Sequence, residues 1–129
     1  MLKCNESPPG QLLLAIRQFN CRDWYECHET IEGLWLGETG EMKDFLQGTL
    51  QISVAMLHWQ NGNHGGAVSL LAGGVNYLKR VPDVCLWVDV PALIASAERV
   101  RTALLELGQE RMEMLDPGLI PEIKTVSLP

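Results

Sequence analysis

A long stretch without proline, residues 44–59, constrains the fold of this chain most strongly. It is too long and unbroken for a strand, so we predict a single helix extending from about residue 42 to residue 60. Apolar side chains cover most of its circumference, which is typical of a buried helix. They are Phe45, Leu46, Leu50, Ile52, Met56, Leu57 and Trp59. The sequence therefore predicts a fold built around this helix.

Three polar side chains on the same stretch return to one narrow stripe. Gln47, Gln51 and His58 share it, because spacings of 4, 7 and 11 residues repeat the same helical face. A buried polar group without a partner costs roughly 1–3 kcal/mol, so large polar groups on a buried helix need partners. We expect the three side chains to be largely inaccessible and to face the polar centre of the molecule.

Four further helices are predicted from capping residues and from apolar side chains at helical spacing. Ser7 caps the first helix, which has proline in its first turn, Asp23 caps the second and Asn63 a third. Gly108 closes the last helix. The expected ranges are about 8–20, 24–36, 65–80 and 89–107, with a loop at 82–87 that includes a short extended piece. The predicted fold is all-α, a compact five-helix bundle around the buried central helix.

Length and composition predict how many domains the chain forms and whether it has a hydrophobic core. A chain of 129 residues with 47% hydrophobic residues is expected to form one globular domain, 1–129, with a real core. From about residue 109 the tail carries Pro117, Gly118 and Pro121, and is expected to lie over the surface without regular structure. Trp24, Trp35 and Trp59 are predicted to belong to the core.

Charge and targeting signals exclude several classes of partner. The net charge of −6 argues against nucleic acid and anionic membranes, which both require basic patches. There is no long apolar run to span a bilayer and no apolar signal sequence at the start, so we predict a cytoplasmic protein. The four cysteines show no C-x-x-C spacing and are expected to be reduced thiols without catalytic roles.

A short acidic motif invites comparison with the H-E-x-x-H zinc motif. His28 and Glu29 begin it, but the second histidine is absent, and Glu32 stands one helical turn after His28. His28 and Glu32 are therefore spaced to chelate one ion from one helix. A dinuclear iron site needs paired Glu-x-x-His motifs, and that arrangement is missing.

The connection between the second helix and the central helix is short, which predicts antiparallel neighbours. His28 and Glu32 would then oppose Gln51 and His58 across this contact. Two interpretations follow, a buried polar network that holds the helices in register or a functional pocket, and the network is the one we favour. The glycine-rich residues 61–67 match no phosphate-binding fingerprint, so we expect a turn there, with His64 exposed to solvent.

Taken together, these motifs resemble domain-of-unknown-function family 309. The residues that carry the resemblance begin with Phe19 and Asn20, continue through Glu26, His28, Glu29, Glu32 and Trp35, and resume at Gln47, Gly48, Gln51, His58, Gly62, Asn63, Gly66 and Ala67. The resemblance implies a small all-helical cytosolic protein without an established activity. Members are sometimes labelled predicted metal-dependent hydrolases, a label that depends on the same His-Glu motif. The family's polar positions correspond here to His28, Glu29, Glu32, Gln47, Gln51, His58 and Asn63.

Two function hypotheses remain. In the favoured one, the chain is a binding or structural module, whose ligand-contact residues would be His28, Glu32, Trp35, Gln47, Gln51, His58 and Asn63. Its partner would be a small-molecule ligand, and homo-oligomer formation stays open. In the alternative, the chain is a metal-dependent hydrolase. A divalent metal would be held by His28, Glu32 and His58, with Glu29 as the catalytic base. Against it, Glu29 points about 100° away from His28 on the helix.

Overall fold

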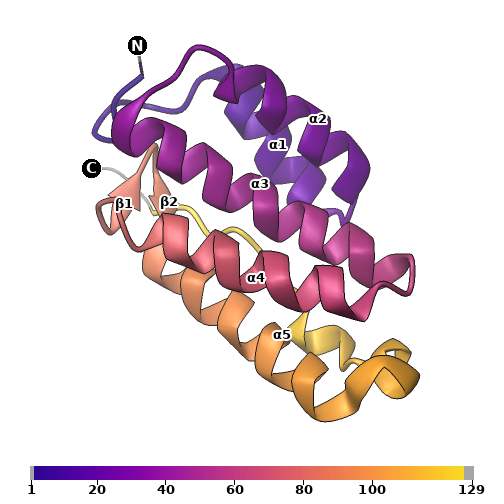
Figure 1. Cartoon of the computed structure of the whole chain (residues 1–129). Coiled ribbons are helices and arrows are strands. Elements are labelled where there is room, and N and C mark those ends of the chain that lie inside the picture. Colours follow the sequence, from indigo (N-terminus) through magenta and orange to yellow (C-terminus); the bar gives the residue numbers. More distant parts are fainter. Residues whose placement is uncertain (1, 127–129) are drawn as a thin grey trace.

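The computed structural model describes residues 2–126, and the last three positions of the predicted tail, 127–129, lie outside them. The described residues form five α-helices in a sequential up-and-down arrangement (Figure 1). The all-α five-helix fold is therefore confirmed. The helices are α1 (Gly10–Asn20), α2 (Trp24–Trp35), α3 (Gly40–Gln60), α4 (His64–Leu78) and α5 (Val90–Arg111).

Helix α3 occupies the middle of the molecule, with α1 and α2 on one side and α4 and α5 on the other (Figure 1). Its buried side chains include Phe45, Ile52 and Met56, each at most 1% exposed. Full burial of such a side chain stabilises the folded state by about 1.5–3 kcal/mol relative to leaving it exposed. Thr49 and Ser53 are its buried polar residues, and their hydroxyls donate to the carbonyls of earlier residues in the same helix.

The start of α1 differs from the prediction. Ser7 does not cap this helix, because Pro9 stands at the cap position with extended backbone angles (φ −68°, ψ 159°). A residue that precedes proline is pushed away from the helical region, which keeps Pro8 out of the helix as well. The first helical residue is therefore Gly10.

The corners that follow α1 and α3 share one backbone geometry. After α1, the Asp23 amide donates to the Gln18 carbonyl at 2.9 Å, and Arg22 adopts a left-handed φ of 65°. After α3, the Asn63 amide donates to the His58 carbonyl at 2.8 Å, and the left-handed residue is Gly62 (φ 77°). Both corners are Schellman motifs, which satisfy the last carbonyls of each helix.

Helices α3 and α4 approach closely because two glycines face each other. A Cβ on Gly74 would lie 2.9 Å from the Gly48 carbonyl oxygen, and a Cβ on Gly48 would lie 2.7 Å from Cγ of Leu78. Side-chain atoms do not fit at such distances, so only glycine allows this approach. Gly74 is therefore the residue of α4 at which the two helix backbones approach closely.

A two-stranded hairpin connects α4 to α5. Strands β1 (Val84–Cys85) and β2 (Val88–Asp89) pair antiparallel, and the two turn residues, Leu86 and Trp87, both have positive φ. This is the backbone twist that suits tight hairpins. The short extended piece expected in the loop at 82–87 is β1, and β2 follows directly after that loop. Asp89 then caps α5 by accepting from the Ala92 amide at 3.1 Å.

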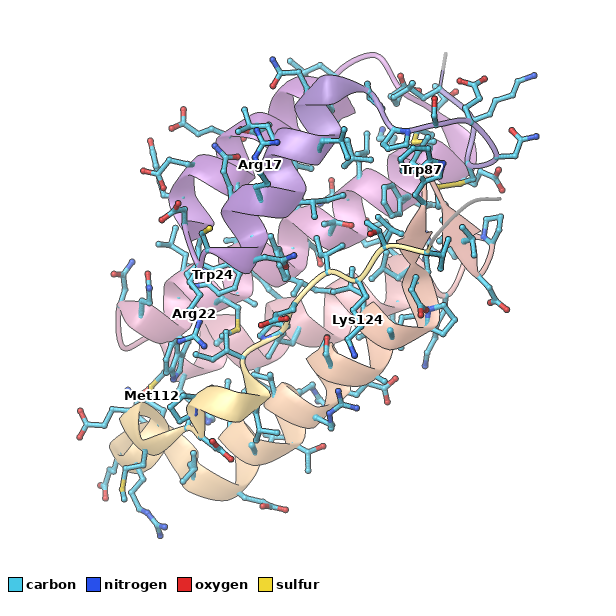
Figure 2. All side chains as sticks on the ribbon, turned by 180° about the vertical axis from the view of Figure 1, so that it is seen from behind. Arg17, Arg22, Trp24, Trp87, Met112 and Lys124 are labelled. Carbon is cyan, nitrogen blue, oxygen red and sulfur yellow. A yellow bond between two sulfur atoms is a disulfide. The ribbon has the colours of Figure 1, made fainter. Side chains whose placement is uncertain are left out.

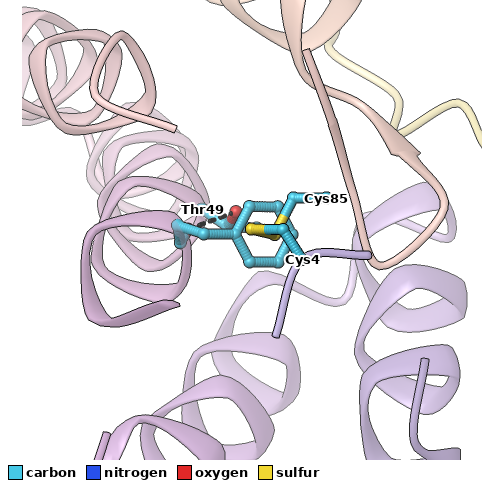
Figure 3. Close-up of a disulfide and its surroundings, with 4 residues drawn as sticks. Cys4, Thr49 and Cys85 are labelled. Carbon is cyan, nitrogen blue, oxygen red and sulfur yellow. Dashed lines mark hydrogen bonds between the residues drawn. A yellow bond between two sulfur atoms is a disulfide. The ribbon is translucent and has the colours of Figure 1, made fainter. Parts of the chain in front are cut away.

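A disulfide joins Cys4 to Cys85, across a sequence separation of 81 residues (Figure 3). It is buried beside Thr49 of α3, and the Leu86 amide donates to the Cys4 carbonyl at 2.8 Å. The prediction that all four cysteines are reduced is therefore wrong for this pair. Spacing alone does not indicate a bond between cysteines brought together only by the folded bundle. Cys21 and Cys27 are free thiols.

The described part of the tail is more ordered than the sequence predicts. It includes two short 3₁₀ helices, η1 (Met112–Met114) and η2 (Pro117–Leu119), and a bridge from Thr125 to Val88 of β2. The Asn20 side chain holds it on α1, donating to the Ile123 carbonyl at 3.0 Å and accepting from its amide at 2.7 Å. The tail thus crosses the rear face between α1 and α5 (Figure 2).

A search of the described residues for a membrane-crossing helix, one both long and apolar enough, finds none.

Candidate functional site

The polar stripe of α3 is less buried than predicted. Gln47, Gln51 and His58 are all partly exposed, so the expectation that they are largely inaccessible is wrong. The buried face of α3 runs through Phe45, Ile52 and its neighbours, on the side of the helix opposite the stripe. Apolar residues beside the stripe, such as Leu50 and Leu57, are only partly buried, although their chemistry suggested a fully enclosed helix.

The stripe also faces a different neighbour from the one predicted. Gln51 lies against Gly73 of α4, where its side-chain oxygen fills the space that a Cβ would take. On another side of α3, Cys27 of α2 shares a hydrogen bond with Ser53. The prediction that His28 and Glu32 oppose Gln51 and His58 is therefore wrong, because α4 covers the side of α3 that carries Gln51.

His58 and Asn63 meet at the α3–α4 corner. The Asn63 amide nitrogen lies 3.2 Å from Nδ1 of His58, and its oxygen accepts from the Gly66 amide at 2.9 Å. Asn63 is thus the N-cap of α4, as predicted, and His58 orients it. Both side chains are engaged in building this turn.

His64 has a role that the sequence did not indicate. It was expected to be solvent-exposed, but it is partly buried, and its Nε2 donates to the Leu104 carbonyl of α5 at 2.7 Å. Its backbone amide also donates to the Gln109 side chain at 3.3 Å. The glycine-rich turn therefore joins α4 to α5, near the break in α5 at Gly108 (φ 75°).

His28 and Glu32 form the pair predicted from their spacing. Nε2 of His28 lies 3.0 Å from Oε2 of Glu32, and the two side chains are 29% and 54% exposed. The ring of Tyr25, also largely exposed, lies 5.9 Å from the His28 ring at an angle of 47°. Because Glu32 is more than half exposed, the pair belongs to the surface and is not the buried network that we favoured from the sequence.

The remaining predicted residues do not converge on this pair. Glu29 is exposed on α2. Trp35 is partly buried and has the Lys43 ammonium 4.9 Å from its ring centre, an arrangement that favours a cation–π contact. Gln47 is partly exposed on α3. Of the other tryptophans, Trp24 is buried, and Trp59 donates from its indole to the Met112 carbonyl at 2.7 Å.

The predicted metal ligands are not brought together. Within residues 2–126, no three His, Cys, Asp or Glu side chains are grouped closely enough to hold a metal ion. His28 and Glu32 supply two donors on α2, while His58 is hydrogen-bonded to Asn63 at the corner between α3 and α4. The donor set of the hydrolase hypothesis is therefore divided between two places.

The two free cysteines occupy different environments. Cys27 is buried, and its thiol donates to the Ala15 carbonyl at 3.4 Å. Burial raises the pKa of this thiol to about 12, although a hydrogen bond with Ser53 acts in the opposite direction. A thiol of this kind is not a nucleophile at neutral pH. Cys21 is exposed at the α1–α2 corner.

The amino-acid sequence is similar to one described protein family and to one curated protein. Residues 12–70 match the model of the family described as Domain of unknown function (DUF309), so the resemblance to family 309 is confirmed for this segment. The chain is also 34% identical, over 59 residues, to "Uncharacterized protein YpuF" of Bacillus subtilis (strain 168). The matched segment covers 45% of this chain and 34% of that relative, so the chain spans about a third of the length of the curated relative it matches.

Proposed function

We propose that this chain is a helical binding module, and that its contact face is a stripe of α2 formed by Tyr25, His28, Glu29 and Glu32, the α2 stripe. The proposal depends on one observation: some of the predicted site residues bind neighbouring residues of the protein, whereas others face solvent. His58, Asn63 and Gln51 contact neighbouring residues that build the α3–α4 hairpin. Among the predicted site residues, His28, Glu29 and Glu32 lie together on α2 and face solvent, and the exposed Tyr25, which was not predicted as a site residue, lies beside His28.

The four residues of the α2 stripe share one side of the helix. Their spacings of 3, 4 and 7 residues from Tyr25 fall within about 100° of helical rotation. Tyr25, Glu29 and Glu32 are exposed, and His28 is partly exposed. The stripe therefore offers one aromatic face, one imidazole and two carboxylates to a ligand.

This chemistry suits a small organic cation. Carboxylates attract positive charge, and an exposed aromatic face binds ammonium groups with about 0.5–1 kcal/mol at surface sites. The net charge of −6 favours the approach of such a ligand. Weak, readily reversible binding is the expectation, because the stripe is open to water.

The test is an NMR titration of the full chain with tetramethylammonium chloride, with sodium chloride at equal ionic strength as the control. We expect saturable shifts centred on the amides of residues 25–32, lost in Tyr25→Ala and reduced in Glu32→Gln. Glu98→Gln, which removes an exposed carboxylate from α5, serves as the matched control and should leave the shifts unchanged. Shifts spread evenly over the surface, or unaffected by Tyr25→Ala, would refute the assignment of the stripe.

The metal-dependent hydrolase is the second candidate, and the 3.0 Å contact between His28 and Glu32 favours it, since two ligands of one ion stand at such positions. In that case Glu29 would act as the base and His58 would need to leave Asn63. Elemental analysis of protein purified without added metal separates the two candidates. We expect no stoichiometric zinc or iron, and one equivalent of metal that disappears in His28→Ala would contradict this and favour the metal-dependent hydrolase.

The cytoplasmic location and the single-domain organisation of residues 1–129 belong to the same proposal. The disulfide weighs against the location, because such bonds persist mainly in oxidising compartments. Counting free thiols in protein taken directly from the native host tests it, and four reactive thiols after unfolding would support a reducing compartment. Coincident unfolding transitions of helicity and tryptophan fluorescence would support one domain.

A further inference from the structure

We infer that the groove between α5 and the tail is a binding site for a small molecule carrying a phosphate group. The groove has a volume of about 510 Å³ and is lined by Arg22 from the α1–α2 corner, Arg99 from α5 and Lys124 from the tail. Such a volume lies within the range of about 300–1,000 Å³ found for small-molecule sites. We call it the cation groove, and it is separate from the α2 stripe.

The three cations are unusual in this acidic chain. The whole sequence has 10 Lys and Arg against 16 Asp and Glu, yet three of the 10 border this one groove. Ion pairs within residues 2–126 join His28 to Glu32 and Arg80 to Asp44, so none of the three has a carboxylate within 4.0 Å in the described chain. The charges of Arg22, Arg99 and Lys124 are therefore available to an anion.

Ordered backbone positions the residues that carry these cations around the groove. The Lys124 carbonyl accepts from the Asp89 amide at 2.9 Å, which fixes this part of the tail to β2. Arg22 sits in the Schellman corner, and its Nη2 lies 3.4 Å from the Pro117 carbonyl. Figure 2 shows Arg22 and Lys124 on the same rear face, on either side of η2 and the tail. A groove with an ordered backbone loses less entropy when a ligand binds than a groove formed by mobile segments.

The lining indicates a ligand with both an anionic and an apolar part. Ala92 and Ala95, one turn apart on α5, give the groove a shallow floor, and Leu119 and Ile120 contribute apolar surface from the tail. Glu122 also lines the groove and is an acceptor for a ligand hydroxyl or amine. With one carboxylate against three cations, the lining keeps a net charge of +2.

Phosphate matches this arrangement better than a carboxylate does. A phosphate monoester carries a charge of about −1.5 to −2 at pH 7 and has three terminal oxygens, so it can accept from three cations at once. Arginine guanidinium groups pair with phosphate through two parallel hydrogen bonds, and lysine adds a point charge. A single carboxylate has one charge and two oxygens and would leave one cation without a partner.

The test is calorimetric titration of the oxidised full chain with glycerol 3-phosphate, beside inorganic phosphate, succinate and glycerol. We expect saturable binding of glycerol 3-phosphate, weaker binding of inorganic phosphate, and none of glycerol. NMR shifts should centre on the amides of Ala95, Ser96 and Gly118. Arg99→Gln and Lys124→Gln should each weaken binding by about tenfold, because each removes a charged hydrogen bond. Glu122→Gln should strengthen the binding of inorganic phosphate, because it removes a carboxylate that repels the anion.

Lys79→Gln is the matched control, since Lys79 is an exposed lysine outside the groove. It removes the same charge and should leave affinity unchanged. Absence of saturable binding, or an equal loss in Lys79→Gln, would overturn the site. Succinate binding as tightly as glycerol 3-phosphate would overturn the assignment to phosphate. Arg99 and Lys124 are exposed, so their variants should fold as the parent does, and unchanged helical circular dichroism verifies it.

Discussion

The α1–α2 and α3–α4 hairpins turn through the same type of corner but are held together differently. The α3–α4 hairpin supplies its own contacts, through the Gly48–Gly74 approach and the Asn63 cap. The α1–α2 hairpin has a bond of its own, from the Cys27 thiol to the Ala15 carbonyl, but it is joined in addition to residues far away in the sequence. These links are the disulfide of Cys4, which precedes α1, and the pairing of Asn20 with Ile123. The difference shows that equal backbone geometry does not imply equal local stability.

Reducing the disulfide should have the largest effect. Closing a loop of this length, with the two cysteines 81 residues apart, lowers the entropy of the unfolded chain and stabilises the fold by about 4–5 kcal/mol. Urea denaturation of oxidised and reduced protein measures the difference. Hydrogen exchange should accelerate more in α1–α2 than in α3–α4. Cys21→Ala, at an exposed free thiol, is the control, and equal acceleration in both hairpins would contradict the comparison.

Gly74→Ala should lower the free energy of unfolding by about 2–3 kcal/mol. The added Cβ would press on the Gly48 carbonyl and force the two helices apart. Gly73→Ala is the matched control on the same helix. Its Cβ meets only the end of the Gln51 side chain, which can rotate away, and alanine improves helix propensity by about 1 kcal/mol. Chemical denaturation should therefore show a clear loss of stability for Gly74→Ala, and little loss or a gain of stability for Gly73→Ala. Equal losses would show that the close approach is not specific to Gly74.

The caps of α2 and α4 should differ by about 1 kcal/mol. Asn63→Ala removes the bond to the Gly66 amide and leaves His58 without its partner, which should cost about 1 kcal/mol of stability. Asp23 stands at the equivalent position of α2 but makes no side-chain cap bond, so Asp23→Ala should change stability very little. A large loss at Asp23 in thermal unfolding would remove the distinction between the corners.

Exchanging the left-handed residues of the two corners should change stability in opposite directions. Arg22→Gly places glycine at φ 65° and should stabilise the fold by about 0.5–1 kcal/mol, whereas Gly62→Ala should destabilise it by a similar amount. Calorimetric melting temperatures report both changes. If Arg22→Gly is destabilising, the contact between Arg22 and the Pro117 carbonyl contributes more than the backbone conformation costs.

The His28–Glu32 pair should give the smallest effect. A thermodynamic cycle of His28→Ala, Glu32→Ala and the double variant should yield a coupling of about 0.3–0.5 kcal/mol, as is usual for exposed pairs one turn apart. Glu32 is 54% exposed, so the 3–5 kcal/mol expected for breaking a buried ion pair does not apply. A coupling above about 2 kcal/mol would indicate that the pair is buried in solution.

The sequence predicted the elements of this fold better than their contacts. Spacing of apolar residues and caps such as Asn63 located the helices, because these signals are local. The same spacing placed Gln47, Gln51 and His58 on one face of α3 but did not reveal which helix covers that face. The apolar residues beside the stripe suggested complete burial, and only the packing of α4 determined the actual exposure.

Contacts between distant residues lay beyond prediction for the same reason. Nothing near Cys4 distinguishes it from Cys21, and the disulfide follows only from where the hairpin places Cys85. The cation groove combines residues 22, 99 and 124, which are far apart in the sequence. The net charge of −6 does not indicate that three cations gather at one place. Of the candidate site, the sequence predicted the His28–Glu32 pair correctly, because both residues lie on one helix.

The pairing of Asn20 with Ile123 has a consequence for the order of events during synthesis. Ile123 leaves the ribosome 103 residues after Asn20, which at about 5–20 residues per second is a delay of roughly 5–20 seconds. Helices form in about a microsecond, so α1 and α2 have time to form long before the segment that secures their corner is synthesised. During this interval the exposed Cys21 and the free amide of Asn20 lie open to other chains. A nascent-chain complex stalled before residue 120 should therefore expose this corner to proteases that the completed chain resists.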